Sequence, residues 1–236
     1  MQRSSGPDDV VGPLGKPSEI ENFGTAVVVS GSVGTAMAYP TARELKRAGN
    51  NVVSIVGAHS IDLLAPEDAV RQVSDKTYVV TDDGSAGEKG VVTDKLKELV
   101  ANGNVDYVLA VGPVPMMRAV ANLTSPQLMT MVSLNSIMVD GTGVCGGCRV
   151  LVNHGSQFAC VDGSEFDASQ VNFEVLTQRS NLYREQCRRR HRDRWFDCDS
   201  GHGCWTLGRQ INQRVSEEFR WSPRRDGKAC GQLITR

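Results

Sequence analysis

Three cysteines and one aspartate lie close together at a spacing that suits metal chemistry. Asp140 is followed after four residues by Cys145 and after two more by Cys148, and Cys160 comes after eleven intervening residues. The plant-type [2Fe–2S] pattern is Cys-x4-Cys-x2-Cys with a distant fourth cysteine, so this spacing is kept with aspartate in the first position. Glycines in the loop permit tight turns that bring backbone N–H groups toward cluster sulfurs. They are Gly141, Gly143, Gly146 and Gly147.

A structural zinc site is the alternative chemistry for the same cysteines. Zinc takes four ligands, and the three thiolates with Asp140 or His154 would complete such a set. Carboxylate is a harder and less covalent ligand than thiolate, so at an iron centre Asp140 should change the reduction potential and the lability of the cluster. The spacing favours iron and sulfide over zinc, and free structural thiols are the least favoured reading.

Composition narrows the class of protein. The chain has 236 residues, 40% of them hydrophobic, and a formal net charge of −1, so it has no basic excess for nucleic acid. We find no run of about 18 apolar residues and no apolar signal sequence, which argues against a membrane protein. The seven cysteines are odd in number and clustered, unlike a disulfide framework. We therefore expect a cytoplasmic protein that binds neither nucleic acid nor membrane.

A glycine-containing turn follows the first apolar run, residues 25–29. It reads Gly31, Ser32, Val33, Gly34, Thr35 and Ala36, and it precedes a helical stretch at 38–48. Backbone N–H groups at such a strand-to-helix turn can meet a pyrophosphate, so we predict that Gly31, Val33, Gly34, Thr35 and Ala36 bind a nucleotide cofactor. Because the full G-x-G-x-x-G pattern is absent, an ordinary tight turn remains the alternative.

Other loops follow later strands at the edge where open α/β sheets bind ligands. Residues 112–116 end one strand, and their predicted cofactor contacts are Gly112, Pro113, Pro115 and Met116. Asp82 and Asp83 are predicted to lie near a ribose, and His59 follows the second strand where a ribose-recognising residue would stand. The alternatives are a strand-to-helix turn with proline near the helix start, a simple acidic turn and a solvated histidine.

The pattern between these loops predicts an α/β fold. Apolar, β-branched runs at 52–57, 77–80, 107–111 and 129–134 alternate with helical stretches that start at 66, 92 and 114. Such alternation is typical of a parallel sheet covered by helices on both faces. We place this nucleotide-binding domain at residues 23–135.

The remaining segments differ in composition. Residues 1–22 are expected to be a linker, and residues 136–175, with short β segments at 149–152 and 157–159, a small domain that needs a metal as a staple. Residues 176–236 are predicted to hold a helix and then an irregular or disordered tail. This tail contains an arginine run at 188–192 and the unconvincing zinc ligands Cys198, His202 and Cys204. A reading-frame slip would also explain its composition.

Taken together, these segments resemble a known family. The chain resembles the electron-transfer (small) subunit of NADPH-dependent ferredoxin reductases and of dihydroorotate dehydrogenase, also described as sulfide dehydrogenase. The matching segments are residues 12–15 (GPLG), 33–36 (VGTA), 81–85 (TDDGS), 112–116 (GPVPM), 138–149 (MVDGTGVCGGCR) and 158–163 (FACVDG).

The resemblance implies an FAD-binding barrel, a nicotinamide-nucleotide domain of ferredoxin-reductase type and a [2Fe–2S] domain, in that order. The barrel should precede Gly12, so the chain is expected to be truncated and residues 1–22 to be the remnant of a linker. Members of the ferredoxin reductase type carry aspartate for one cluster cysteine, whereas the dihydroorotate type usually carries cysteine, so Asp140 argues against a dedicated pyrimidine role. His59 stands where NADPH-preferring members tend to carry arginine, and Ala86 where an aromatic is common.

We therefore expect a subunit of an NAD(P)H-dependent oxidoreductase that passes electrons between NAD(P)H, FAD and a [2Fe–2S] cluster. The cluster ligands would be Asp140, Cys145, Cys148 and Cys160, and the FAD site would be incomplete in this chain. The implied partners are a larger catalytic flavoprotein or dehydrogenase subunit, and ferredoxin. No side chain is expected to act as an acid or base, because the cofactors carry the redox step. A zinc-stapled adaptor without redox activity and an inactive truncated fragment are the alternatives.

Overall fold

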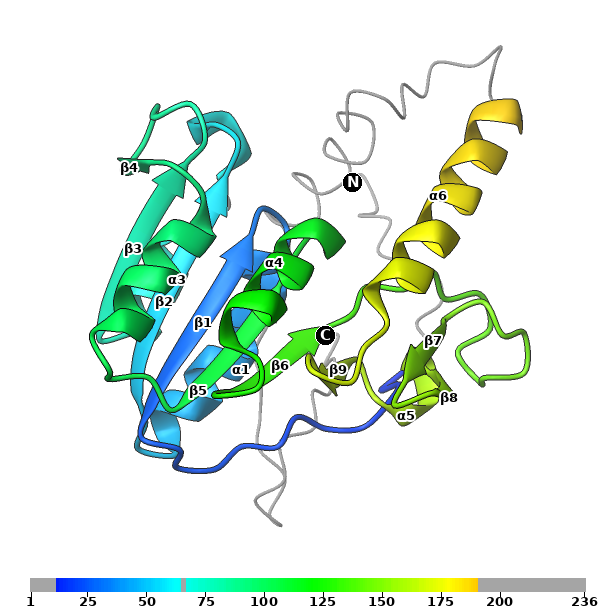
Figure 1. Cartoon of the computed structure of the whole chain (residues 1–236), viewed down its shortest axis with the longest axis horizontal. Helices are drawn as coiled ribbons and strands as arrows, with labels where there is room; N and C mark the ends of the chain where they lie inside the picture. Colours follow the sequence, from blue (N-terminus) through cyan, green and yellow to red (C-terminus); the bar gives the residue numbers. More distant parts are fainter. Residues whose placement is uncertain (1–11, 65–66, 191–236) are drawn as a thin grey trace, which may run out of the picture.

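The structure is a computed structural model that describes residues 12–64 and 67–190 of the chain. Its centre is a seven-stranded sheet in the order β4-β3-β2-β1-β5-β6-β9 (Figure 1). The strands are β1 (Thr25–Gly31), β2 (Asn51–Ala58), β3 (Lys76–Thr81), β4 (Glu88–Lys89), β5 (Tyr107–Val111), β6 (Met129–Ser133) and β9 (Glu165–Asp167). All neighbouring pairs are parallel except β6 and β9. The predicted α/β fold is therefore confirmed, with one antiparallel strand added at an edge.

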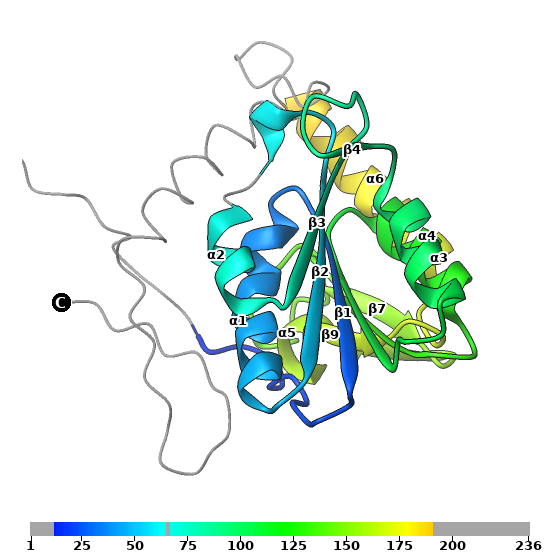
Figure 2. The same ribbon diagram turned by 90° about the vertical axis from the view of Figure 1, so that its left-hand side faces the viewer.

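Helices cover both faces of this sheet, as Figure 2 shows from the side. On one face lie α1 (Gly34–Arg47) and α2 (Glu67–Val73), and on the other α3 (Val92–Ala101) and α4 (Val114–Thr124). A short 3-10 turn, η1 (Ile61–Leu63), precedes α2. The central strands are apolar on both sides, and β5 is buried at every residue. None of the helices within the two described ranges is long and apolar enough to cross a membrane.

The segment after β6 forms a smaller unit beside the sheet. A hairpin of β7 (Arg149–Val152) and β8 (Gly155–Phe158) turns through Asn153 and His154, both in the left-handed region with φ of 49° and 61°. The short α5 (Ala159–Asp162) and the strand β9 follow, and then the long α6 (Phe173–Arg190), which packs on α4 and β7. The unit is therefore joined to the large sheet at two places, through β9 and through α6.

Most of the predicted elements agree with the structure, and the differences are as follows. Helix α1 begins at Gly34, before the predicted start at Ala38. Ala159 opens α5, so the predicted β segment 157–159 was wrong at its last residue, and β8 begins earlier, at Gly155. Strands β4 and β9 were not predicted, because elements of two and three residues are too short for an alternation pattern. Helix α6 begins at Phe173, before the predicted segment 176–236. The tail candidates Cys198, His202 and Cys204 lie outside the described residues.

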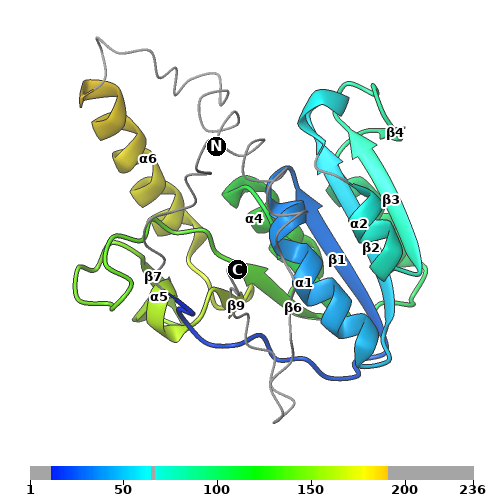
Figure 3. The same ribbon diagram turned by 180° about the vertical axis from the view of Figure 1, so that it is seen from behind.

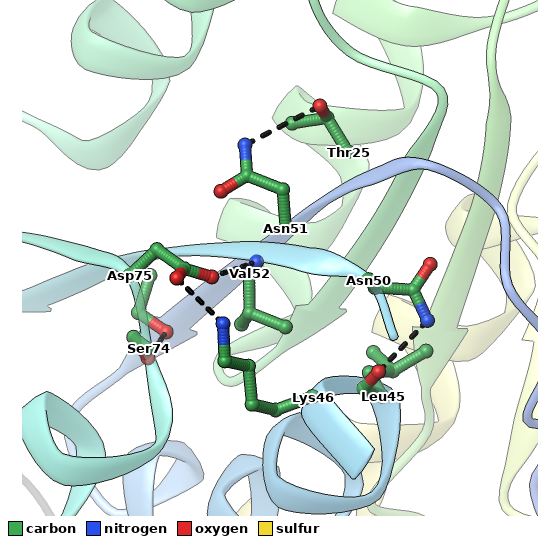
Figure 4. A network of polar contacts seen from close by, with 9 residues as sticks. Thr25, Leu45, Lys46, Asn50, Asn51, Val52, Ser74 and Asp75 are labelled. Carbon is green, nitrogen blue, oxygen red and sulfur yellow. Dashed lines mark hydrogen bonds and ion pairs between the residues drawn. The ribbon is translucent and has the colours of Figure 1, made fainter. Parts of the chain in front are cut away.

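Asn50 ties the incoming chain to the amino edge of the sheet. Its buried Oδ1 accepts hydrogen bonds from the backbone N–H of Phe23 (2.7 Å) and of Gly24 (3.2 Å). Its Nδ2 donates to the carbonyl oxygens of Glu21 (2.7 Å) and Leu45 (2.8 Å; Figure 4). One amide therefore links the backbone of residues 21–24 to the end of α1 through four hydrogen bonds.

Asp75 makes a second polar anchor nearby, also drawn in Figure 4. Its Oδ2 accepts the backbone N–H of Val52 (2.9 Å), and Lys46 donates to its Oδ1. The hydrogen bond from Lys46, followed by that from Val52, holds the pKa of the Asp75 carboxyl below its ordinary value. Asp75 thus joins the end of α1 to the start of β2 and β3.

Replacement of Asn50 should destabilise the fold far more than replacement of its neighbour. Asn50→Ala removes four hydrogen bonds made by a buried side chain, so we expect the free energy of unfolding to fall by about 2–4 kcal/mol. Asn51→Ala is the matched control, because Asn51 is exposed and its side chain makes one long bond of 3.4 Å to Thr25; it should cost about 0.5 kcal/mol or less. Urea unfolding followed by circular dichroism measures both. Equal losses would show that the Asn50 network does not anchor the segment.

Candidate functional site

The carboxyl ends of β1 and β5 form the switch point of the sheet. The connection from β1 through α1 leads to β2, whereas the connection from β5 through α4 leads to β6 on the other side. In open α/β sheets a crevice forms where the two connections part, and ligands bind there. The two loops predicted to bind the nucleotide cofactor, 31–36 and 112–116, both lie at this point.

Three glycines allow these loops to approach each other closely. A Cβ atom on Gly34 would lie 2.3 Å from the carbonyl oxygen of Val111, and one on Gly31 would lie 2.8 Å from Met116 Sδ. A Cβ on Gly112 would meet the Gly31 amide nitrogen at 3.1 Å. The structure thus brings together the predicted residues Gly31, Gly34, Gly112 and Met116, and no side chain larger than hydrogen fits between the two loops.

The first loop presents backbone N–H groups rather than side chains. The backbone amides of Thr35 and Ala36 close the turn, because they donate to the carbonyls of Ser32 and Val33 at 3.1 Å each. The Thr35 hydroxyl points inward and donates to Ser30 Oγ (3.1 Å). Within the described part of the chain, the amides of Val33 and Gly34 form no backbone hydrogen bond. The first N–H groups of a helix have no partner inside it and favour an anion. Val33 and Gly34 are thus the free donors of this turn.

Ser32 is a residue of this loop that the sequence-based site did not include. It stands in the left-handed region with φ of 60°, which is uncommon for a residue other than glycine, asparagine or aspartate. Its hydroxyl is buried and has no hydrogen-bond partner among the described residues. The signal in the sequence was its position within the strand-to-helix turn that was predicted to bind the nucleotide. An unpaired hydroxyl in this turn is a donor that a bound phosphate would satisfy.

The loops after β2 and β3 place His59 beside Asp82. His59 Nδ1 lies 3.1 Å from Asp82 Oδ2, and both side chains are exposed. The carboxylate of Asp83 accepts instead from the amide (2.9 Å) and the hydroxyl (2.6 Å) of Ser85, and the hydroxyl bond leads the causes that lower the pKa of Asp83. Asp82 therefore faces His59, while Asp83 stabilises its own turn. The sequence, in which the two aspartates are adjacent, did not distinguish these roles.

Two of the predicted metal ligands meet at the base of the β7–β8 hairpin. The sulfurs of Cys148 and Cys160 are buried and lie 3.1 Å apart, and the Cys160 N–H donates to Cys148 Sγ at 3.4 Å. The hydrogen bond between the two thiols and burial raise the pKa of Cys160. Thiolates on one tetrahedral metal stand about 3.8 Å apart for metal–sulfur bonds of about 2.3 Å. The pair therefore needs only a small separation to share a metal.

Asp140 and Cys145 lie on the facing loop. Asp140 Oδ1 accepts the Thr142 N–H and its Oδ2 the Cys145 N–H, both at 2.9 Å, and the bond from Thr142 leads the causes that lower the Asp140 pKa. Cys145 is exposed, and the N–H of Gly147 donates to its sulfur at 3.4 Å. The loop lies against the residue that follows Cys160, because a Cβ on Gly143 would stand 2.9 Å from Val161 Cγ2.

These residues fit an iron–sulfur centre better than the zinc alternative with His154. That histidine sits at the tip of the β7–β8 hairpin, at the opposite end from Cys148 and Cys160. The sulfurs of Cys145 and Cys148 both accept backbone N–H groups, as cluster sulfurs commonly do. Among the described residues, no group of three His, Cys, Asp or Glu side chains is yet drawn together closely enough to hold a metal ion. Ligation by Asp140, Cys145, Cys148 and Cys160 thus stays a prediction.

Comparison with known proteins decides the family. Residues 135–172 match the model of the iron–sulfur cluster binding domain of dihydroorotate dehydrogenase B. A dihydroorotate dehydrogenase B (NAD(+)) electron transfer subunit from Bacillus velezensis is 32% identical over 176 residues, which cover 72% of this chain and 67% of that protein. The chain belongs to this family of electron transfer subunits. Its residues 135–172 form an iron–sulfur cluster binding domain.

Two other relatives are more similar to this chain, and each is longer than the part that the chain matches. The electron transfer subunit homolog from Thermotoga maritima is 50% identical over 179 residues, which cover 75% of this chain and 63% of that protein. A solved structure of the NADH-dependent reduced ferredoxin-NADP oxidoreductase, studied for flavin-based electron bifurcation, superimposes with a TM-score of 0.71 and 46% identity. That superposition covers 76% of this chain and 65% of the solved chain. The chain thus spans just under two thirds of both relatives.

Loss of one buried sulfur should remove the iron. Cys160→Ser takes away a thiolate in contact with Cys148, so we expect the iron bound after anaerobic purification to fall to about a tenth or less of the wild-type amount. Cys198→Ser is the control, because Cys198 lies outside both the matched domain and the described residues. Iron and sulfide are measured colorimetrically. Unchanged iron in the Cys160→Ser protein would remove Cys160 from the ligand set.

Proposed function

We propose that this chain is the nucleotide- and cluster-binding part of an electron-transfer subunit in a flavin and iron–sulfur oxidoreductase. It would pass electrons between NAD(P)H, FAD and a [2Fe–2S] cluster, to or from a partner subunit. The observation that carries the proposal is the family match over residues 135–172, with the sulfurs of Cys148 and Cys160 3.1 Å apart inside it. The close approach of the two glycine-containing loops at the carboxyl edge of the sheet supports the nucleotide half of the proposal.

The nucleotide would bind across the carboxyl edge of the sheet. The free amides of Val33 and Gly34 meet its phosphates, with the Ser32 hydroxyl as a further donor. Asp82, held by His59, faces the ribose, and residues 112–116 form the floor for the nicotinamide or the flavin edge. These groups bind and orient the cofactor, and none of them needs to transfer a proton.

The cluster would be held by Asp140, Cys145, Cys148 and Cys160. When bound, it supplies one-electron chemistry that a nicotinamide, which transfers a hydride, lacks. Burial of Cys148 and Cys160 keeps water from two of the sulfurs, while Cys145 stands at the surface. The carboxylate of Asp140 already holds the loop through two backbone N–H groups, so it would both order the loop and ligate iron.

The surface around Cys145 is the proposed binding surface for a partner subunit. Apolar side chains are exposed along the cluster loop, with Val139 74% and Val144 87% accessible, and Val161 is exposed next to Cys160. Exposed apolar patches of this kind mark interaction sites. A larger catalytic flavoprotein or dehydrogenase subunit that covers this surface would stand next to the exposed sulfur, and ferredoxin is a second candidate for the same surface.

Metal and sulfide content test the proposal directly. We expect the anaerobically purified chain to hold about two irons and two sulfides, with broad visible absorbance that dithionite bleaches. Stoichiometric zinc in a colourless protein would overturn the electron-transfer function and leave a zinc-stapled adaptor. A folded chain that binds neither metal nor nucleotide would instead be an inactive fragment.

A charge placed in the phosphate turn should weaken nucleotide binding. Asp tolerates the left-handed backbone at position 32, so Ser32→Asp keeps the turn but repels the phosphates, and we expect the Kd for NAD(P)H to rise about tenfold or more. Ser32→Asn is the matched control, because asparagine has the same shape and conformational tolerance without the charge. Isothermal titration calorimetry with NADH and NADPH measures both variants. A Kd that is equal in the two variants would place the phosphates elsewhere.

A further inference from the structure

The chain that enters the sheet connects the cluster-binding unit to the amino edge of the nucleotide-binding domain. Residues 12–23, which we call the entry segment, run beneath the sheet from the β7–β8–α5 region to the start of β1 (Figures 1 and 3). At its far end, Phe23 stacks on Tyr107 with ring centroids 4.4 Å apart, and Asn50 binds the backbone of Phe23. The entry segment is thus fixed to the nucleotide-binding domain before β1 begins.

Near its other end, Gly15 lies directly on the turn that carries Cys160. Its N–H donates to the Cys160 carbonyl oxygen at 2.8 Å. A Cβ on Gly15 would lie 3.1 Å from Gly163 Cα and 3.2 Å from the Ala159 oxygen, and its φ is +75°. Both the left-handed conformation and the lack of space therefore require glycine at this position.

The neighbouring Leu14 covers the loop that carries Asp140. A Cβ on Gly141 would lie 2.9 Å from Leu14 Cδ1, so the leucine side chain rests on the backbone next to Asp140. Further along, the Ser18 hydroxyl donates to Glu165 on β9 at 2.8 Å. Adjacent residues of the entry segment thus touch both loops from which the four predicted ligands come.

We propose that Leu14 and Gly15 are positioning residues for the iron–sulfur centre. Neither residue is a predicted ligand, but together they fix the position of the Cys160 turn relative to the Asp140 loop. Groups that orient metal ligands in this way affect metal affinity about 10–100-fold when they are replaced. The inference rests on the proposed function, because it concerns a cluster on Asp140, Cys145, Cys148 and Cys160.

The experiment compares three variants of the full chain after anaerobic purification. Gly15→Ala adds a methyl group against the Cys160 turn, and Leu14→Ala uncovers Gly141. Gly103→Ala is the control: Gly103 has φ +74° and no atom within 4 Å of an added Cβ, so it reports the backbone strain alone. The readouts are the rate at which the visible absorbance bleaches in air, the midpoint potential and the electron paramagnetic resonance spectrum of the reduced protein.

We expect bleaching about tenfold faster in Gly15→Ala and about threefold faster in Leu14→Ala than in wild type. Both variants should also shift the midpoint potential, whereas Gly103→Ala should match wild type in all three readouts. A general loss of stability would not move the potential of the protein that remains folded. If Gly15→Ala does not fold by circular dichroism, Leu14→Ala decides, because it only shortens a partly exposed side chain.

The outcomes separate this inference from the proposed function. The wild type could hold the cluster while Leu14→Ala and Gly15→Ala bleach at the same rate and have the same midpoint potential as Gly103→Ala. That result overturns the positioning role and leaves the proposed function standing. A wild type without iron and sulfide overturns both. Faster bleaching with a shifted potential in the two variants, and not in the control, supports the positioning role.

Discussion

At the carboxyl ends of β1 and β5, the start of α1 lies directly on the backbone of Val111, with no room for even a methyl group on Gly34. This contact sets where α1 begins, since the helix must leave the strand at the point of closest approach. It also brings Gly31 against Met116 and Gly112, so that the two loops meet as one surface. The free amides and the unpaired Ser32 hydroxyl follow from the same tight turn.

The cluster-binding unit depends on the large sheet for its position. Strand β9 leaves that unit and pairs with β6, where Phe166 stands opposite Val132, and α6 packs against α4. The entry segment adds a third connection through Gly15 and Ser18. A unit as small as residues 136–175 has little core of its own, so these three attachments fix the distance between the cysteines and the carboxyl edge of the large sheet. The proposed electron transfer between two cofactors requires a fixed distance of this kind.

Much of the fold could be predicted because its signals are local. The continuous apolar runs of β1, β2 and β5 are long enough to identify buried parallel strands, and Gly49 stops α1 with φ of 91°. Strand β9 escaped prediction because three residues, two of them acidic, carry no pattern until β6 pairs with them. Helix α1 starts early because Gly34, a poor helix former, is placed there by its contact with Val111 and not by propensity.

By itself, the sequence determined which residues are able to bind a metal and in which loop they lie, because ligand spacing within a loop is a property of the chain. The spacing of Asp140, Cys145 and Cys148 is of this kind. Only the tertiary structure decided that Cys160 reaches Cys148, that His59 faces Asp82, and that Leu14 covers Gly141. These partners are separated along the chain and meet because a hairpin, neighbouring parallel strands and the entry segment bring their backbones together, which no local pattern records.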